Sequence, residues 1–209
     1  MADVFDTSSW LPLFPLQTVL FPDGLLPLKI FETRYIDMVR ECMRLERPFG
    51  VVALRRGSET GAGAEPESVG CLARIIEWDM EPGGLLHIRT RGEQRFRIHQ
   101  SRVLTDQRNE ALITLLPVDA TTVPDANHVR CAKALKLVTD DFDQRAKQDA
   151  QFADVFAKPL RFDDAGWVAN RWCEILPIPV KARQKLLELD DPVARLGIIF
   201  AYLQQHEIL

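Results

Sequence analysis

The sequence has few cysteines and no long apolar run, and these absences exclude several classes of protein. The four cysteines, at positions 42, 71, 131 and 173, lie too far apart for a Cys-x-x-Cys metal or redox pair, so we expect them to be reduced and buried. No apolar run approaches the ~20 residues that a membrane helix needs. The acidic start, MADVFDTSSW, has no basic flank before an apolar core, which excludes a signal peptide. We therefore predict a cytoplasmic protein without a membrane span.

The sequence also lacks the motifs of common nucleotide-binding and hydrolytic enzymes. It has no Gly-x-x-x-x-Gly-Lys-[Ser/Thr] loop, and the glycine-rich run at 57–63 has no lysine and opens no helix. It has no Gly-x-Ser-x-Gly elbow. His128 and Cys131 have the i, i+3 spacing of two metal ligands on a helix, but no third ligand accompanies them. We therefore expect no catalytic residue, no cofactor and no metal, and predict that the chain is not an enzyme.

Neither half of the chain has an excess of positive charge. The net charge is -4, and by our count residues 1–118 hold 14 basic and 16 acidic residues, the remainder 12 and 14. Such a balance gives no basic half to attract nucleic acid. The composition, 46% hydrophobic and 27% charged, is typical of a globular protein with a core of ordinary size.

The most informative part of the sequence is an apolar, proline-rich stretch from Trp10 to Tyr35. Its prolines exclude a helix, so we predict extended segments at 11–16 and 25–31, joined by a turn at 22–24. A helix follows, with Thr33 as its expected N-cap. The turn region is apolar where turns are usually polar, which indicates either core packing or a groove for unfolded segments. The candidate peptide-binding side chains are Phe14, Phe21, Leu25, Leu26 and Tyr35.

The rest of the first half reads as short strands. Beyond a strand at 49–54, the polar residues 55–69 predict a mobile surface loop. We expect further strands at about 69–80, 85–91, 95–104 and 111–116, with turns at 81–84 and 92–94. So many short strands with one helix favour a closed or nearly closed β-barrel over a parallel α/β fold.

The second half is helical throughout. Residues 117–125 predict a linker, and four amphipathic helices follow it, with starts near Asp164, at Pro179 and at Asp191. These helices can bury their apolar faces against one another or against the barrel. The sequence therefore predicts an α+β protein with a barrel subdomain at 1–118 and a helical subdomain at 119–209.

Four arginines form the candidate charged surface stripe. If residues 92–94 form a three-residue hairpin loop, Arg89 lies opposite Arg97 and Arg91 opposite Arg95 on the outer face, with Phe96 inside. Like charges directly opposed are unfavourable, so a carboxylate must compensate them. The alternatives are a solvated face paired within the chain, or a site for an acidic peptide or nucleic acid. The candidate carboxylates within the chain are Glu32, Glu77 and Glu110.

Several segments carry a family resemblance. L-P-L-F-P-L, V-L-F-P, L-P-L-K-I-F-E and E-T-R-Y, followed by G-E-Q-R-F-R-I, E-I-L-P-I and L-D-D-P-V-A-R-L, resemble the landmarks of the Lon protease N-terminal substrate-binding domain. The chain departs from the pattern at Thr33, where the family often has proline. The resemblance implies a PUA-like β-barrel with one helix, followed by a helical lobe. It also implies the stand-alone bacterial form, without ATPase or protease domains.

The resemblance sets two expectations for function. The first is a non-catalytic module that holds exposed apolar segments of unfolded client proteins and delivers them to a protease. The second is binding of RNA, because PUA-like barrels elsewhere bind RNA and the arginine hairpin could contact phosphates. The acidity of both halves argues against nucleic acid.

Overall fold

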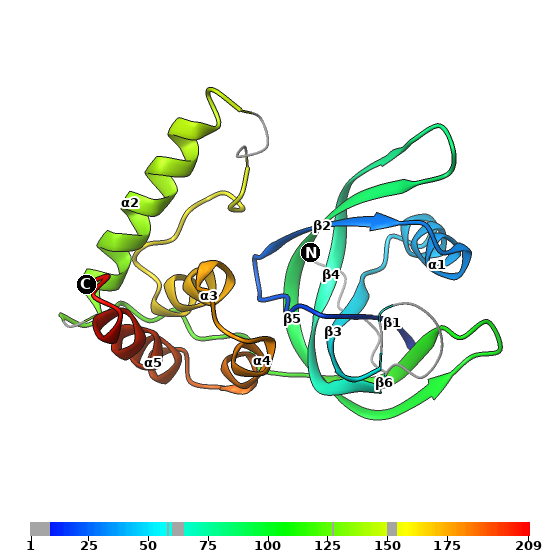
Figure 1. The fold of residues 1–209 in the computed structure, drawn as a ribbon. Coiled ribbons are helices and arrows are strands. Elements are labelled where there is room, and N and C mark those ends of the chain that lie inside the picture. Colours follow the sequence, from blue (N-terminus) through cyan, green and yellow to red (C-terminus); the bar gives the residue numbers. More distant parts are fainter. Residues whose placement is uncertain (1–8, 58, 60–64, 127, 150–153) are drawn as a thin grey trace. The chain divides into compact units, whose positions relative to one another are not determined.

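The structure is a computed structural model, and it describes residues 9–57, 59, 65–126, 128–149 and 154–209. The chain divides into two compact units, Met1–Pro117 and Val118–Leu209 (Figure 1). The described part of the first unit is a β-sheet with an α-helix, and that of the second is helical.

The first unit is built on a six-stranded sheet that closes on itself. The strands lie in the order β2-β5-β4-β3-β1-β6, and a further pairing between β5 and β6 joins the sheet into a barrel. β1 and β3 run parallel while the other pairs are antiparallel, which confirms the predicted α+β class with a mixed barrel. The elements are β1 (Leu11–Leu16), β2 (Leu25–Ile30), α1 (Thr33–Arg44), β3 (Phe49–Arg56), β4 (Glu65–Met80), β5 (Leu86–Val103) and β6 (Asn109–Leu115).

The interior of the barrel is filled around Phe96. This side chain is 0% exposed, and its ring lies where Gly50 and Gly70 have no side chain. A Cβ on either glycine would come within 2.7 and 2.6 Å of the ring, respectively. Burying one such aromatic side chain contributes roughly 1.5–3 kcal/mol, so the two glycines are needed to keep this contribution. The other interior residues are Leu11, Leu13, Val52, Leu72, Ala111 and Ile113.

A second core lies between the outside of the barrel and α1. Tyr35, Met38, Val39 and Cys42 recur at three- and four-residue steps along α1, and all are buried. They pack with residues of β1, β3 and β4 that face away from the barrel interior. β1 is therefore buried on both faces, which explains its continuous apolar sequence. The predicted N-cap, Thr33, is the first helical residue instead.

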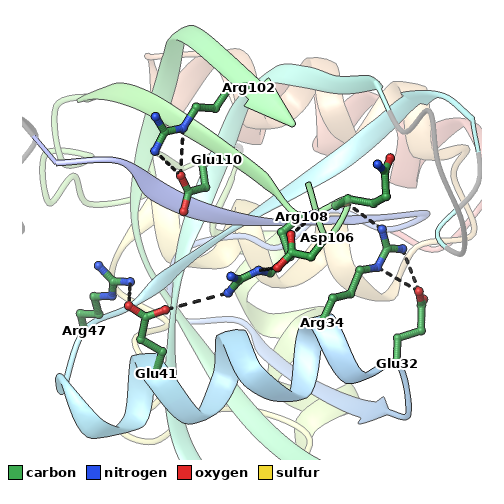
Figure 2. A network of polar contacts seen from close by, with 9 residues as sticks. Glu32, Arg34, Glu41, Arg47, Arg102, Asp106, Arg108 and Glu110 are labelled. Carbon is green, nitrogen blue, oxygen red and sulfur yellow. Dashed lines mark hydrogen bonds and ion pairs between the residues drawn. The ribbon is translucent and has the colours of Figure 1, made fainter. Parts of the chain in front are cut away.

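Charged side chains tie α1 to the turn between β5 and β6 (Figure 2). Near the start of the helix the Arg34 guanidinium donates to the Gln107 carbonyl at 2.7 Å. Near its end, Glu41 lies 3.9 Å from Arg108, which also pairs with Asp106 at 2.6 Å. Burial raises the pKa of Asp106, but hydrogen bonds from Arg108 and its positive charge outweigh this, so the pKa lies below its ordinary value. The network holds the helix over its core.

β4 and β5 form one long hairpin, and its far end extends away from the barrel (Figure 1). The predicted turn at 81–84 is present, since the Glu81 N–H donates to the Leu85 carbonyl at 2.9 Å. The predicted turn at 92–94 is wrong, because β5 runs without interruption through these residues. A shift of register marks the place instead: Cys71 lies opposite Arg95, but Ala73 lies opposite Gly92.

Gly92 allows the turn before β2 to approach β5 closely. A Cβ at this position would lie 2.1 Å from the carbonyl oxygen of Phe21, so a larger residue cannot fit. The Gly92 N–H donates to the Gly24 carbonyl and its carbonyl accepts from the Asp23 N–H, both at 2.8 Å. The turn before β2 is thus pressed onto the middle of β5.

The predicted polar loop at 55–69 is shorter in the structure. β3 continues to Arg56 and β4 begins at Glu65, and these two residues lie opposite each other. A polar composition does not prevent strand pairing at the end of a hairpin, where side chains remain in water. Residues 58 and 60–64 of the predicted loop lie outside the described residues.

The helices of the second unit begin close to the expected residues. The Asp164 carboxylate accepts from the Gly166 N–H at 3.0 Å, and Asp191 accepts from the Val193 N–H at 2.8 Å, as N-caps do. Pro179 precedes its helix as the N-cap, not as the first helical residue. The helices are α2 (Val129–Arg145), α3 (Ala165–Ile175), α4 (Val180–Glu188) and α5 (Pro192–Gln205).

Arg195 of α5 joins the parts of this unit from inside. Its side chain is 0% exposed, and a buried guanidinium needs acceptors for its donors. One acceptor, Asp119, belongs to the segment at 117–125 that the sequence predicts as a linker, so this segment is held on the helices. The acceptors are Asp119 at 2.6 Å, Asn170 at 2.8 Å, and the carbonyls of Leu186 and Leu189 at 3.0 and 2.6 Å.

Candidate functional site

Three of the predicted peptide-binding side chains lie in the core. Phe21 is 0% exposed, so the prediction that it belongs to an accessible groove is wrong. Phe14 and Tyr35 are 7% and 3% exposed, and their rings stack with centroids 4.2 Å apart. The turn is apolar because it packs against β5 at Gly92, as the two backbone hydrogen bonds there show. Its hydrophobicity therefore serves packing.

Leu25 and Leu26, the other two candidates, begin β2 and are half-buried. They lie opposite Arg91 and Thr90 of β5, and Leu26 packs against the core beneath α1. Their contact with a peptide stays a prediction.

The four arginines do not share one face. Arg95 is 2% exposed, with its guanidinium 3.5 Å from the Pro117 carbonyl, so it is no part of a surface stripe. Arg97 is exposed, whereas Arg89 and Arg91 are half-buried. The prediction is wrong because residues 92–94 continue the strand, and the register shift there breaks the alternation of faces along β5.

Carboxylates of the same chain compensate the half-buried arginines. Glu77, one of the predicted candidates, lies 3.5 Å from Arg89, and Asp23 lies 2.5 Å from Arg91. The other two candidates pair elsewhere, Glu32 with Arg34 and Glu110 with Arg102. This pairing favours the solvated, internally paired face over a nucleic-acid site.

An exposed apolar surface lies elsewhere, at the end of β4. Trp78 is 60% exposed and Ile76 44%, whereas their neighbours on β5 and β2 are buried or half-buried. The rows across the three strands place Trp78 beside Ile88 and Leu28, on the face that packs beneath α1. Trp78 thus continues the apolar core out to the surface.

Two hollows flank Trp78. One, of ≈ 410 Å³, lies against β2 and β5 and includes Leu28 and Ile88 in its lining. The other, of ≈ 350 Å³, lies against the end of α1 and includes Met43 and Ile76. Trp78 lines both, so it lies beside two places where an apolar side chain could be buried. An exposed apolar surface beside hollows is typical of a binding site.

A third hollow, of ≈ 230 Å³, also lies against β2. Phe14, Tyr35 and Phe31 line it, and Phe31 is 65% exposed. It shares Leu28 with the hollow beside Trp78. Two of the predicted side chains therefore line a hollow, although both are almost fully buried.

A shift of register gives Ile76 its exposure. Ile75 lies opposite Thr90 and Glu77 opposite Arg89, so Ile76 is an extra residue in β4. Such a bulge re-aims side chains and increases the local twist. The sequence I-I-E-W-D-M holds the signal, since two adjacent isoleucines break the alternation of a strand. We predicted a strand here but no exposed face.

The described residues contain no group of three or more His, Cys, Asp or Glu side chains placed to hold a metal. All four cysteines are buried, and burial raises the thiol pKa of Cys42 and Cys131 to about 11 and of Cys173 to about 12. Such thiols are poor nucleophiles and poor metal ligands at neutral pH.

No helix in the described part of the chain is both long enough and apolar enough to span a bilayer.

A mixed β-barrel and a helical unit define an α+β protein, and an exposed apolar surface beside hollows is typical of a binding module. Comparison with known proteins identifies its kind. The chain belongs to the family of ATP-dependent protease La (LON) substrate-binding domains, whose model matches residues 10–205. The resemblance seen in the sequence is therefore confirmed.

Solved structures show the same fold. A Lon N-terminal domain protein from Xanthomonas campestris is 31% identical, with a TM-score of 0.74, over 93% of this chain and 98% of that one. The N-terminal domain of the Mycobacterium avium complex Lon protease is 18% identical, with a TM-score of 0.63, over 95% and 100% of the two chains. This second likeness shows the fold alone.

The likeness to complete Lon proteases is partial. The Lon protease of Anaeromyxobacter dehalogenans is 25% identical over 98% of this chain but only 24% of its own length. The chain thus spans about a quarter of the curated Lon protease that it matches, and the matching family model describes a substrate-binding domain.

Proposed function

We propose that this protein is a non-catalytic, polypeptide-binding module that holds apolar side chains of unfolded client segments at Trp78. Membership of the LON substrate-binding family supports binding of protein substrates. The single observation that carries the site is the exposure of Trp78, 60%, beside two hollows whose linings combine apolar and charged side chains. This surface replaces the predicted groove at Phe21 as the proposed binding site.

The chemistry of the surface suits unfolded polypeptide. A tryptophan that is exposed in the free protein regains its transfer free energy when a ligand covers it, and buried aromatic anchors dominate many interfaces. The two arginines that line the Met43 hollow already have carboxylate partners, Arg47 with Glu41 and Arg74 with Glu93. They therefore need no carboxylate from a client, and apolar contact remains the main source of affinity in this hollow.

The proposal is tested by binding of an unfolded client. Fluorescently labelled casein is titrated with the wild-type protein and with Trp78→Ser, and the dissociation constant is measured by anisotropy. We expect Trp78→Ser to weaken binding by about tenfold or more, because truncation of an aromatic anchor costs about 2 kcal/mol or more. Thermal melts should show both proteins folded.

Ile198→Ser provides a matched control. Ile198 lies on α5 and is 51% exposed, so the change removes a comparable exposed apolar group from the other unit. We expect its affinity for casein to equal that of the wild type. Equal affinity of Trp78→Ser and the wild type would refute the site.

The expected partner protease and the cytoplasmic location belong to the same proposal. In this arrangement the module would hold a client while another protein carries out hydrolysis. A purified sample should therefore bind casein without degrading it, which gel electrophoresis of the mixture over time would show. RNA binding is not proposed, because Arg89 and Arg91 pair with carboxylates of the chain and Arg95 is buried.

A further inference from the structure

The end of β4 is an open strand edge. β3 pairs with β4 between Glu65 and Ala73, and β5 alone continues beside β4 as far as Met80. On the other side of residues 74–80, the described residues supply no paired strand. Residues 76–79 are all exposed. An open edge presents backbone donors and acceptors on which a further strand can form.

The hydrogen-bond pattern shows which backbone groups face outward. Glu81 donates to Leu85, and bonded and non-bonded pairs alternate along an antiparallel ladder, so Asp79 and Glu77 are bonded to β5. Trp78 lies between them, and its N–H and C=O point to the open edge. The next outward N–H, at Met80, is met by the Asp79 carboxylate at 2.9 Å.

β2, β5 and β4 lie side by side, and the free edge of β2 offers different backbone groups from that of β4. Gly92 donates to Gly24, so the same alternation makes Leu26 and Leu28 the bonded positions of β2 and turns Pro27 outward. Proline has no N–H to offer to an added strand. β2 therefore lacks a donor at the place where β4 offers Trp78.

Charge shows which segment the β4 edge would accept. Glu77, Asp79 and Glu81 alternate along the end of the strand, and Trp78 faces the opposite side between the first two. Glu77 lies 3.5 Å from Arg89 but its side chain stays 64% exposed, so a basic residue of a client can still approach it. A residue paired directly opposite a carboxylate is favoured when it is basic, and a residue opposite an aromatic ring is favoured when it is apolar. The complementary sequence is an apolar residue between two lysines or arginines.

We propose that the edge at Glu77–Met80 binds an extended client segment of the pattern basic-apolar-basic as an added β-strand, with its apolar side chain against Trp78. This rests on the proposed function and specifies how the client is held. Backbone pairing gives affinity for extended chains, and the alternation gives the sequence preference.

The charge preference is tested with two fluorescein-labelled peptides. Both carry alternating valine and phenylalanine at the apolar positions; the intervening positions are lysine in one and glutamate in the other. We expect the lysine peptide to bind the wild type about tenfold more tightly, from two opposite-charge cross-strand pairs in place of two like-charge pairs. In the double variant Glu77→Lys/Asp79→Lys the preference should reverse.

Two further variants control for folding and for net charge. Glu77→Gln/Asp79→Asn removes the charges but keeps an oxygen at residue 79 that can accept from the Met80 N–H; it should abolish the preference. Lys133→Glu changes charge on α2, in the other unit, and should leave the preference unchanged.

Backbone pairing is tested with the lysine peptide methylated at one amide nitrogen at a time. Methylation at the amide that pairs with the Trp78 carbonyl should weaken binding about fivefold, and methylation at the next amide should not. Uniform effects along the peptide, or an unchanged charge preference in the double lysine variant, would overturn strand addition. If Trp78→Ser still weakened casein binding in that case, the proposed function would stand without it.

A second copy of the chain is the competing occupant of the edge. Sedimentation velocity at increasing protein concentration would show dimers that Trp78→Ser abolishes. Dimers together with no binding of the lysine peptide would overturn the proposal, whereas a monomer that binds the peptide supports it.

Discussion

The stretch from Leu11 to Ile30 and the end of β4 are both rich in apolar residues, but the structure buries most of the first and exposes much of the second. Phe21 is covered because its turn is hydrogen-bonded to the middle of β5, and β1 is covered on both faces. Trp78 lies beyond Ala73, which pairs with Phe49, the first residue of β3, so β3 does not run beside it. The exposure of these aromatic side chains is thus decided by which strands and turns lie beside them, and not by local hydrophobicity.

The largest expected difference between these regions is in stability. Phe21→Ser should lower the free energy of unfolding by about 3–5 kcal/mol, because it leaves a cavity and a buried hydroxyl in the core. Trp78→Ser should change it by less than about 1 kcal/mol, since an exposed side chain has less transfer free energy to lose. Urea denaturation measures both. Similar losses would break the comparison.

Gly92→Ala probes the contact that covers the turn. The added Cβ would meet the Phe21 carbonyl at 2.1 Å, so we expect a loss of about 1–3 kcal/mol and a lower midpoint of thermal unfolding. Gly197→Ala is the control, because its Cβ would meet no atom closer than 3.9 Å and alanine favours a helix by up to about 1 kcal/mol. A neutral Gly92→Ala would show that the turn can move away from β5.

Thiol labelling reports whether the core beneath α1 is closed. The pKa of Cys42 is raised to about 11, so at pH 8 about one in a thousand of these thiols is ionised, and the residue is also buried. A chromogenic disulfide reagent should therefore react with it slowly in the native protein. Phe21→Ser should accelerate the reaction by increasing opening, whereas Trp78→Ser should not. Equal acceleration in both variants would contradict the assignment of Trp78 to the surface.

The smallest expected effect concerns pH. The pKa of Asp106 is lower in the folded protein than in the unfolded chain, so its contribution is fully present above the unfolded-state value of about 3.9 and is lost as the pH falls through the folded-state value. For a surface ion pair such as Asp106–Arg108, the contribution to the free energy of unfolding is about 0.5 kcal/mol. Asp106→Asn should remove that part of the acid dependence, measured as the urea midpoint between pH 6 and pH 3. An unchanged acid dependence would show that the Asp106–Arg108 pair does not stabilise the turn to which α1 is tied (Figure 2).

Much of the fold could be predicted from local pattern. The prolines excluded a helix before Thr33, the caps at Asp164 and Asp191 marked two helix starts, and the turn at 81–84 was found from its Pro-Gly-Gly sequence. The prediction of a turn at 92–94 is wrong because Gly92 is required by the close approach of the Phe21 carbonyl, and no local sequence pattern shows such a distant contact.

The candidate site was less predictable than the fold. Phe21 and Trp78 are both aromatic residues in apolar sequence, and their exposure depends on β5 and on where β3 begins, many residues away. The arginine stripe failed for a related reason, since one register shift changes which face each later residue occupies.

The sequence by itself determined the α+β class, most element positions, the buried cysteines and the family, because propensity, caps and motifs act within a few residues. Tertiary structure alone decided that Phe14, Phe21 and Tyr35 lie in the core, that Arg95 is buried, and that Trp78 stands at an open edge. These outcomes depend on strand register and on contacts between distant segments, and the free energy that fixes them comes from the packing of the whole unit.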